Sequence, residues 1–190
     1  MTSVYPLTAA YFHWIVAVPL IGSVGSVLKC QSLPKGDKDK GLWMHRHKSL
    51  GLLTGMLVLP RFGYRLLNFK KHLLPPLEGS GQIEHGMGNL SHLALYGFMT
   101  VMPASGIAMG YYGGKGLPFF NTSFPGVVHT DETKAGNVAI AKQSYSIHKT
   151  LGTYGKYLIP LHAGAAVAHW ARGQSIFTRI NPFRSGFPKH

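Results

Sequence analysis

The chain contains few acidic residues and few charges of either sign. It has six Asp and Glu against 19 Lys and Arg, and charged residues make up 13% of its 190 residues, about half the share in a soluble globular protein. The six acids all lie between long apolar segments: Asp37, Asp39, Glu78, Glu84, Asp131 and Glu132. A carboxylate is costly inside a bilayer. This placement therefore predicts that the apolar segments cross a membrane.

Cysteine is nearly absent, because Cys30 is the only one. Disulfides within the chain, thiolate zinc sites and covalent Cys-x-x-Cys-His haem attachment are thereby excluded, so any haem must be bound without covalent bonds. No Lys or Arg precedes Lys29. We therefore expect neither a cleaved secretory signal nor an Arg-rich transit peptide, and the first apolar segment should stay in the mature protein.

The formal net charge of +13 fits either nucleic acid or anionic lipid as a partner. The aromatic residues lie in apolar runs, and no basic low-complexity arm is present. Nucleic-acid binding is therefore the weaker interpretation. We predict no nucleic-acid partner, and an anionic lipid such as cardiolipin as the partner of the basic surface.

Apolar segments of membrane-spanning length predict an all-α, integral membrane four-helix bundle. The expected spans cover about residues 9–28, 42–67, 86–112 and 145–171. The first is a charge-free stretch of about the 20 residues that a helix needs to cross the hydrocarbon core. Pro160 should bend the fourth helix. Residues 1–190 should thus form a single domain.

The connections between these segments differ in length and composition. Residues 68–85 contain Lys70, Lys71 and two prolines, and are predicted to form a loop. Residues 115–146 form a longer polar connection, which we expect either to be a docking surface or to cap one end of the bundle. The tail, residues 172–190, is basic and contains prolines, which favours a segment lying along lipid headgroups.

Four of the eleven histidines form a pattern of matched depth once the spans are drawn. His13 lies near the side of the membrane that holds the N-terminus, and His47 and His148 open their helices on the opposite side. His162 follows His148 by 14 residues, so the two point within about 40° of each other and lie about 21 Å apart along the helix. His13 thus pairs with His162, and His47 with His148. Two bis-histidine haems at opposite faces of one membrane need this arrangement.

Other histidines compete for these roles. A single histidine in so basic a protein is most often an ordinary polar residue, and His45 and His92 are rivals of the four. His169 follows His162 by seven residues and shares its helix face, so geometry alone does not exclude it as the ligand on that side.

Two arginines in the second span reach the membrane depth of His13 and His162. Arg61 follows His47 by 14 residues and so approaches the other haem, where its guanidinium could pair with a haem propionate. Arg65 lies one turn further on. Snorkelling of both side chains to the membrane interface explains them equally well.

These residues lie in short motifs, which are F-H-W at 12–14, H-K-S-L-G at 47–51, L-S-H-L-A-L-Y at 90–96, P-A-S-G at 103–106, S-I-H-K-T-L-G at 146–152 and L-H-A-G-A-A-V-A-H at 161–169. In them the chain resembles the bacterial-type cytochrome b561 family over nearly its whole length. That family consists of small four-span di-haem proteins related to the cytochrome subunits of hydrogenase and formate dehydrogenase.

The resemblance implies that His13 and His162 hold one haem b and that His47 and His148 hold the other. It also implies electron transfer between a redox partner and membrane quinone, with ubiquinone or ubiquinol as one partner. Some members resemble superoxide:ubiquinone oxidoreductases. We further predict that His169 lies near the His162 haem without binding its iron. There it would donate a hydrogen bond to a propionate or a quinone carbonyl.

Two other classes of function remain open from the sequence. One is a haem-containing accessory or structural subunit of a larger respiratory complex, and the other is a haem-free membrane scaffold. The sequence leaves the electron donor and acceptor undetermined. Lys and Arg are plentiful on both sides, so topology is undetermined too. A bacterial cytoplasmic membrane and a mitochondrial inner membrane both fit, and the absence of a bacterial-style charge asymmetry favours the mitochondrial one.

Overall fold

The computed structural model describes residues 5–68 and 79–183, which are almost entirely helical. The middle of the predicted loop, including Lys70 and Lys71, and the end of the tail, residues 184–190, lie outside the described residues. The helices are α1 (Leu7–Ser32), α2 (Lys40–Leu67), α3 (Gln82–Tyr112), α4 (Asp131–Gly155), α5 (Leu158–Ala171) and the short 3-10 helix η2 (Phe177–Ile180). The predicted all-α fold class is confirmed.

Within the described residues, three helices are long and apolar enough to cross a membrane, namely α1, α2 and α3. They contain the first three predicted spans and extend beyond them. The third begins at Gln82, four residues before the predicted start, and takes in part of the segment predicted as a loop. These helices make the chain an integral membrane protein.

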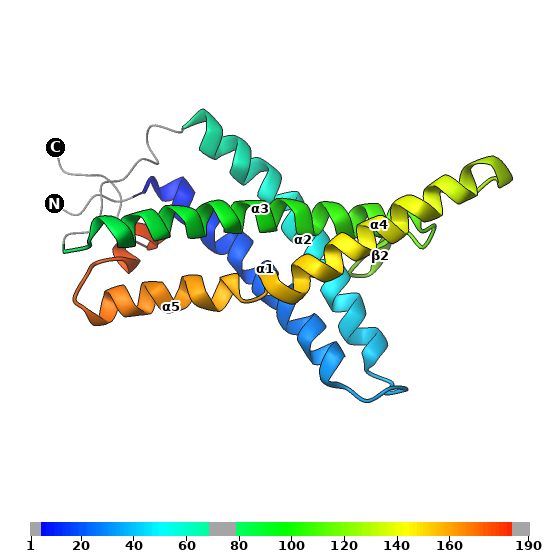
Figure 1. Cartoon of the computed structure of the whole chain (residues 1–190), viewed down its shortest axis with the longest axis horizontal. Helices are drawn as coiled ribbons and strands as arrows, with labels where there is room; N and C mark the ends of the chain where they lie inside the picture. The colour runs from blue at the N-terminus through cyan, green and yellow to red at the C-terminus, as the bar shows by residue number, and fades with distance from the viewer. Residues whose placement is uncertain (1–4, 69–78, 184–190) are drawn as a thin grey trace.

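The prediction of one continuous fourth helix over residues 145–171 was wrong about its boundaries. The helix begins at Asp131, and the chain then breaks at Lys156 and Tyr157 before α5. Pro160 explains the break, because its ring has no N–H and clashes with the carbonyl of residue 156 in a continuous helix. Figure 1 shows α5 carrying the chain onward from the end of α4.

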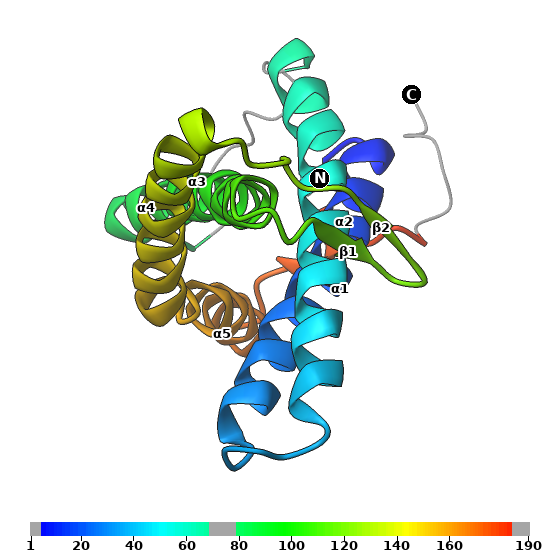
Figure 2. The ribbon, with the colours of Figure 1, turned by 90° about the vertical axis from the view of Figure 1, so that its right-hand side faces the viewer.

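The long connection predicted over residues 115–146 is only partly irregular. Its second half belongs to α4, which begins at a capping box in which Thr130 and Thr133 each bind the other's backbone. Its first half forms a hairpin of β1 (Leu117–Phe119) and β2 (Thr122–Phe124). The strand β1 packs against α2, and Figure 2 shows the hairpin beside that helix. The strand β1 also touches α3, and the two expectations for this connection stay predictions.

The helices pack as two antiparallel pairs that share a small core. Helix α1 runs along α2 and α3 along α4, and the first pair crosses the second obliquely (Figure 1). Val16, Val58 and Met99 bring α1, α2 and α3 together in the buried core. The crossing of α2 and α3 is close at Gly55, where an added Cβ would meet Pro103 at 2.8 Å. Small residues at such crossings are typical of membrane helices.

The distribution of polar and apolar side chains is that of a protein surrounded by lipid. Several large apolar side chains of α1 and α2 are more than half exposed: Val18, Ile21, Leu59 and Leu66. Small hydroxyl residues are buried instead: Ser23, Ser26, Ser49, Thr54 and Ser105. In water this arrangement would be unfavourable, whereas in a bilayer the apolar surface meets acyl chains and the interior takes the polar groups.

The end of the chain returns to the start of α1. The indole N–H of Trp14 donates a hydrogen bond of 2.9 Å to the carbonyl of Ile180, and η2 packs against α1. The segment after α5 therefore lies on the same side of the molecule as the first turns of α1.

Candidate metal centres

His13 and His162 face each other between α1 and α5. Their ring centroids lie 6.3 Å apart, with a tilt of 44° between the ring planes. His13 lies in the second turn of α1, and His162 lies one turn after the start of α5. The helix break before α5 therefore helps to set the direction of His162. The structure brings together the two histidines that were paired by depth.

His47 and His148 form a second facing pair, between α2 and α4. Their centroids lie 6.0 Å apart, with an interplanar angle of 71°. The Nδ1 atom of His47 lies 3.0 Å from the carbonyl oxygen of Ser23 and 3.1 Å from its Oγ. The Nδ1 atom of His148 lies 3.0 Å from the carbonyl oxygen of Met102 and 3.1 Å from Ser105 Oγ. Both rings are therefore held in the same way.

These contacts determine the tautomer of both rings. A carbonyl oxygen can only accept a hydrogen bond, so each Nδ1 must carry the proton. The hydroxyl of Ser23 can give its own hydrogen to the carbonyl of His47, at 3.0 Å, and that of Ser105 can give its hydrogen to the carbonyl of Val101, at 2.7 Å. Both serine oxygens can then accept from the ring. The Nε2 atoms of His47 and His148 keep free lone pairs, as metal binding requires.

The geometry of both pairs fits a metal between two imidazoles. Two rings bound through bonds of about 2.0 Å from nitrogen to metal have their centroids about 6 Å apart. Both measured separations, 6.3 and 6.0 Å, agree with this value. Within the described residues no group of three or more His, Cys, Asp or Glu side chains could hold a metal ion. Two axial imidazoles suffice for haem iron, because the porphyrin supplies the other four ligands.

Of the rival histidines, His45 contacts the hairpin and His92 lies beside the first pair. The Nε2 atom of His45 lies 2.8 Å from the carbonyl of Phe120, so this ring fastens the hairpin to α2. Ser49 adds to the same contact, since its Oγ accepts the backbone N–H of Phe120 at 2.9 Å. His92 lies beside the first pair, with its ring centroid 5.3 Å from that of His162. His45 is thus tied to the hairpin, and His92 neighbours the first pair.

Two arginines of α2 gather around Tyr96 next to the first pair. The guanidinium of Arg65 lies 4.8 Å from the Tyr96 ring centroid and donates a 3.0 Å hydrogen bond to its hydroxyl, and that of Arg61 lies 5.5 Å from the same ring. Arg61 interacts electrostatically with His13 and His162. No carboxylate among the described residues pairs with either arginine. Their positive charge is thus available to an anionic group such as a haem propionate.

The N-terminal segment lies near this positive charge. Burial raises the pKa of the Tyr5 hydroxyl above its usual value, while the nearby guanidiniums of Arg65 and Arg179 act in the opposite direction. Tyr5 is therefore close to both arginines and partly removed from solvent.

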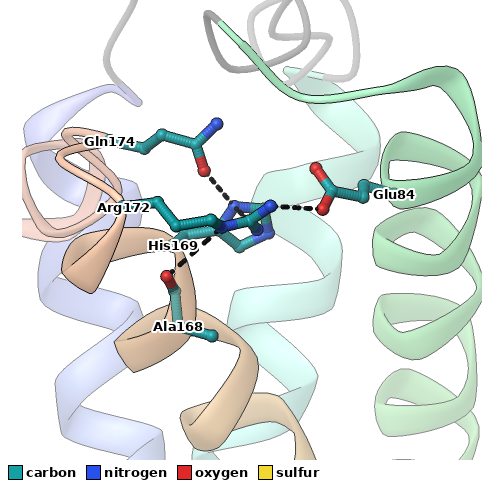
Figure 3. Close-up of polar contacts among 5 residues, drawn as sticks. All are labelled: Glu84, Ala168, His169, Arg172 and Gln174. Atoms are coloured by element: carbon teal, nitrogen blue, oxygen red, sulfur yellow. Dashed lines mark hydrogen bonds and ion pairs between the residues drawn. The ribbon is translucent and has the colours of Figure 1, made fainter.

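His169 lies in a polar cluster at the end of α5, shown in Figure 3. Its Nδ1 lies 2.5 Å from Gln174 Oε1 and 3.1 Å from an Nη atom of Arg172. Arg172 also forms an ion pair with Glu84 of α3 at 2.5 Å. The cluster therefore joins α5 to the start of α3. Nδ1 is occupied, so the Nε2 of His169 is the nitrogen left to meet a further group.

Sequence reasoning overlooked the serines. Ser23 and Ser105 lie inside spans that were interpreted only by their apolar character, and a serine there has no distinctive spacing. Tyr96 was part of a quoted motif but was given no role. A buried hydroxyl in an apolar helix often bonds to its own helix. Only the packed structure shows that these two also reach a histidine.

Comparison with known proteins supports one family. A family model described as prokaryotic cytochrome b561 matches residues 4–182. The chain is also 30% identical over 180 residues to cytochrome b561 homolog 1 of Escherichia coli (strain K12), in an alignment that covers 93% of this chain and 96% of that relative.

Proposed function

Since the chain belongs to the prokaryotic cytochrome b561 family, a family of membrane haem b proteins of electron transfer, we propose that it holds two haem b groups. One lies between His13 and His162, and the other between His47 and His148. The observation that carries this proposal is the pair of facing imidazoles, at 6.3 and 6.0 Å, at two separate places in one bundle. Because the family match spans nearly the whole chain, we treat residues 1–190 as one domain.

Bound haem supplies reversible one-electron redox chemistry at its iron. The chain supplies the environment. His47 and His148 offer Nε2 lone pairs whose direction is fixed through Nδ1. Arg61 and Arg65 offer positive charge for propionates beside the first pair. Near His47, the hairpin is fastened to α2 through His45 and Ser49.

Ubiquinol, or a related membrane quinol, is the proposed partner at the His13–His162 end. The support is His169, whose Nδ1–H donates to Gln174 Oε1, so that its Nε2 carries the lone pair. A quinol hydroxyl donates hydrogen bonds, and the Nε2 lone pair of His169 can accept one. The net charge of +13 would also attract an anion such as superoxide, which supports a superoxide:ubiquinone oxidoreductase as a finer form of the proposal.

The match to a prokaryotic family supports the bacterial cytoplasmic membrane, of the two membranes that the sequence left open. Neither match supports the mitochondrial inner membrane. Anionic lipid such as cardiolipin remains a proposed partner of this basic protein, whose formal net charge is +13.

A visible difference spectrum tests the haem proposal directly. The full chain is purified in detergent, and the spectrum reduced with dithionite is compared with the oxidised one, together with a haem count per chain. Two haems per chain and a b-type α-band are expected. A preparation that folds and stays haem-free after reconstitution with haem b would contradict the proposal.

A second candidate is an accessory haem subunit of a respiratory complex. The observation in its favour is the first half of α4, which is largely exposed and extends past the end of α3 in Figure 1. Such a projection could contact another subunit. Purified, haem-replete protein that neither oxidises quinol nor reacts with superoxide, and that regains activity in its native membrane, would favour this role.

A further inference from the structure

The two histidine pairs differ in what holds their rings. Each ring of the His47–His148 pair shares its Nδ1 proton between a backbone carbonyl and a serine hydroxyl. Within the described residues, no hydrogen bond reaches a ring nitrogen of His13 or His162. Ligands of the two proposed iron sites therefore differ in basicity, because a hydrogen bond accepted from Nδ1–H makes the imidazole a stronger electron donor.

The positive charges around the two pairs also differ, in the direction that separates the reduction potentials of the two sites. Arg61 interacts with both rings of the first pair and is partly buried. The cation that acts on the His47 ring is its exposed neighbour Lys48, whose charge water screens. A partly buried positive charge disfavours ferric haem, which carries one more positive charge than ferrous haem. It thus raises the reduction potential of the first site.

We propose that Ser23 and Ser105 are positioning residues whose hydroxyls, as second acceptors of the Nδ1 protons of His47 and His148, make the haem held by these two histidines the one of lower potential. This inference rests on the proposed function. The stronger donor ligands stabilise the ferric state at this site, while the arginines stabilise the ferrous state at the other. With haem bound at both sites, one electron passed between them would leave the His47–His148 site oxidised and the His13–His162 site reduced, so a single electron in the protein would reside mainly at the latter.

Potentiometric titration of the full chain in lipid nanodiscs tests this assignment. The wild type is expected to titrate as two components. His162→Ala is expected to keep only the lower one, because it retains the His47–His148 site. If the surviving haem titrates with the higher component instead, the assignment is overturned.

The serines are tested in the same way. Ser23→Ala and Ser105→Ala each remove one acceptor of an Nδ1 proton and should shift the lower midpoint potential upward, with a larger shift in the double variant. The upper component should stay in place. Ser105→Thr keeps a hydroxyl and should restore the wild-type value. The matched control is Ser26→Ala, since Ser26 is equally buried on α1 but bonds only to the carbonyl of Gly22.

A failure of the serine role and a failure of the proposed function give different results. Serine variants that leave the lower potential unchanged, or that move it no more than Ser26→Ala, overturn the role of the serines. If the double variant loses haem, the lower midpoint potentials of Ser23→Ala and Ser105→Ala are each compared with that of Ser26→Ala instead. A wild-type chain without b-type haem would instead overturn the proposed function, before any titration is made.

Discussion

The imidazole rings of His47 and His148 lie 6.0 Å apart, centroid to centroid, with the Nδ1 of each turned toward a backbone carbonyl of a neighbouring helix. The carbonyls belong to Ser23 on α1 and Met102 on α3, so all four long helices contribute to this one site. Because each ring is held by a hydrogen bond at its Nδ1, the pair is already oriented to bind a metal between the two rings.

Replacing His148 with Ala should remove the haem that it shares with His47 and leave the other in place, because the two sites use different rings. The expected haem content falls to about half. Replacing His162 should have the converse effect. Haem per chain and the reduced difference spectrum measure both results, with circular dichroism as the control for folding. Loss of both haems from a folded single variant would show that the sites are not independent.

Replacing Arg61 with Gln should lower the midpoint potential of the His13–His162 haem, since a positive charge that favours the ferrous state is removed. A shift on the order of tens of millivolts is expected for one charge at the effective dielectric of a protein. Arg46→Gln is the matched control, because Arg46 stacks on Trp43 near the opposite end of α2. Equal shifts in the two variants would mean that only net charge matters.

Replacing Gly106 with Val should weaken haem binding at the His47–His148 site. A Cβ at this position would lie 3.3 Å from Cε1 of His148, and the two further methyl groups of valine would displace the ring. Gly97→Val is the control, because nothing lies within 4 Å of a Cβ built there on the same helix. Titration of the apoprotein with haem b should show a lower affinity at one of the two sites only in Gly106→Val. Full occupancy of both sites would show that the ring has room to move.

Replacing His169 with Leu should keep both haems bound and slow reduction by quinol, or shift one midpoint potential. The ring lies beside Gln174 and Arg172 rather than facing another histidine, so a hydrogen-bonding role fits it better than iron ligation. Stopped-flow reduction by a soluble quinol analogue is the measurement. Haem loss equal to that of His162→Ala would make His169 the ligand, and unchanged potential and kinetics would leave it as a solvated residue of the interface.

The break before α5 was partly predictable from Pro160. The sequence predicts a bend there, because proline cannot donate to the helix and crowds the carbonyl four residues earlier. The structure has the break at Lys156 and Tyr157, as this clash requires. The start of α4 at Asp131 was missed, because a polar helix has no apolar periodicity by which to distinguish it from a loop.

The sequence by itself determined the membrane class, the first three spans and the order of the four histidines along them. These follow from apolar length, from the rarity of acids and from helical rise, which are local properties of the chain. Only the tertiary structure decided which ring nitrogens are free and which side chains hold them. Ser23 reaches His47, and Ser105 reaches His148, across helix contacts. Such contacts depend on how two helices rotate and cross, and neither helix encodes that alone.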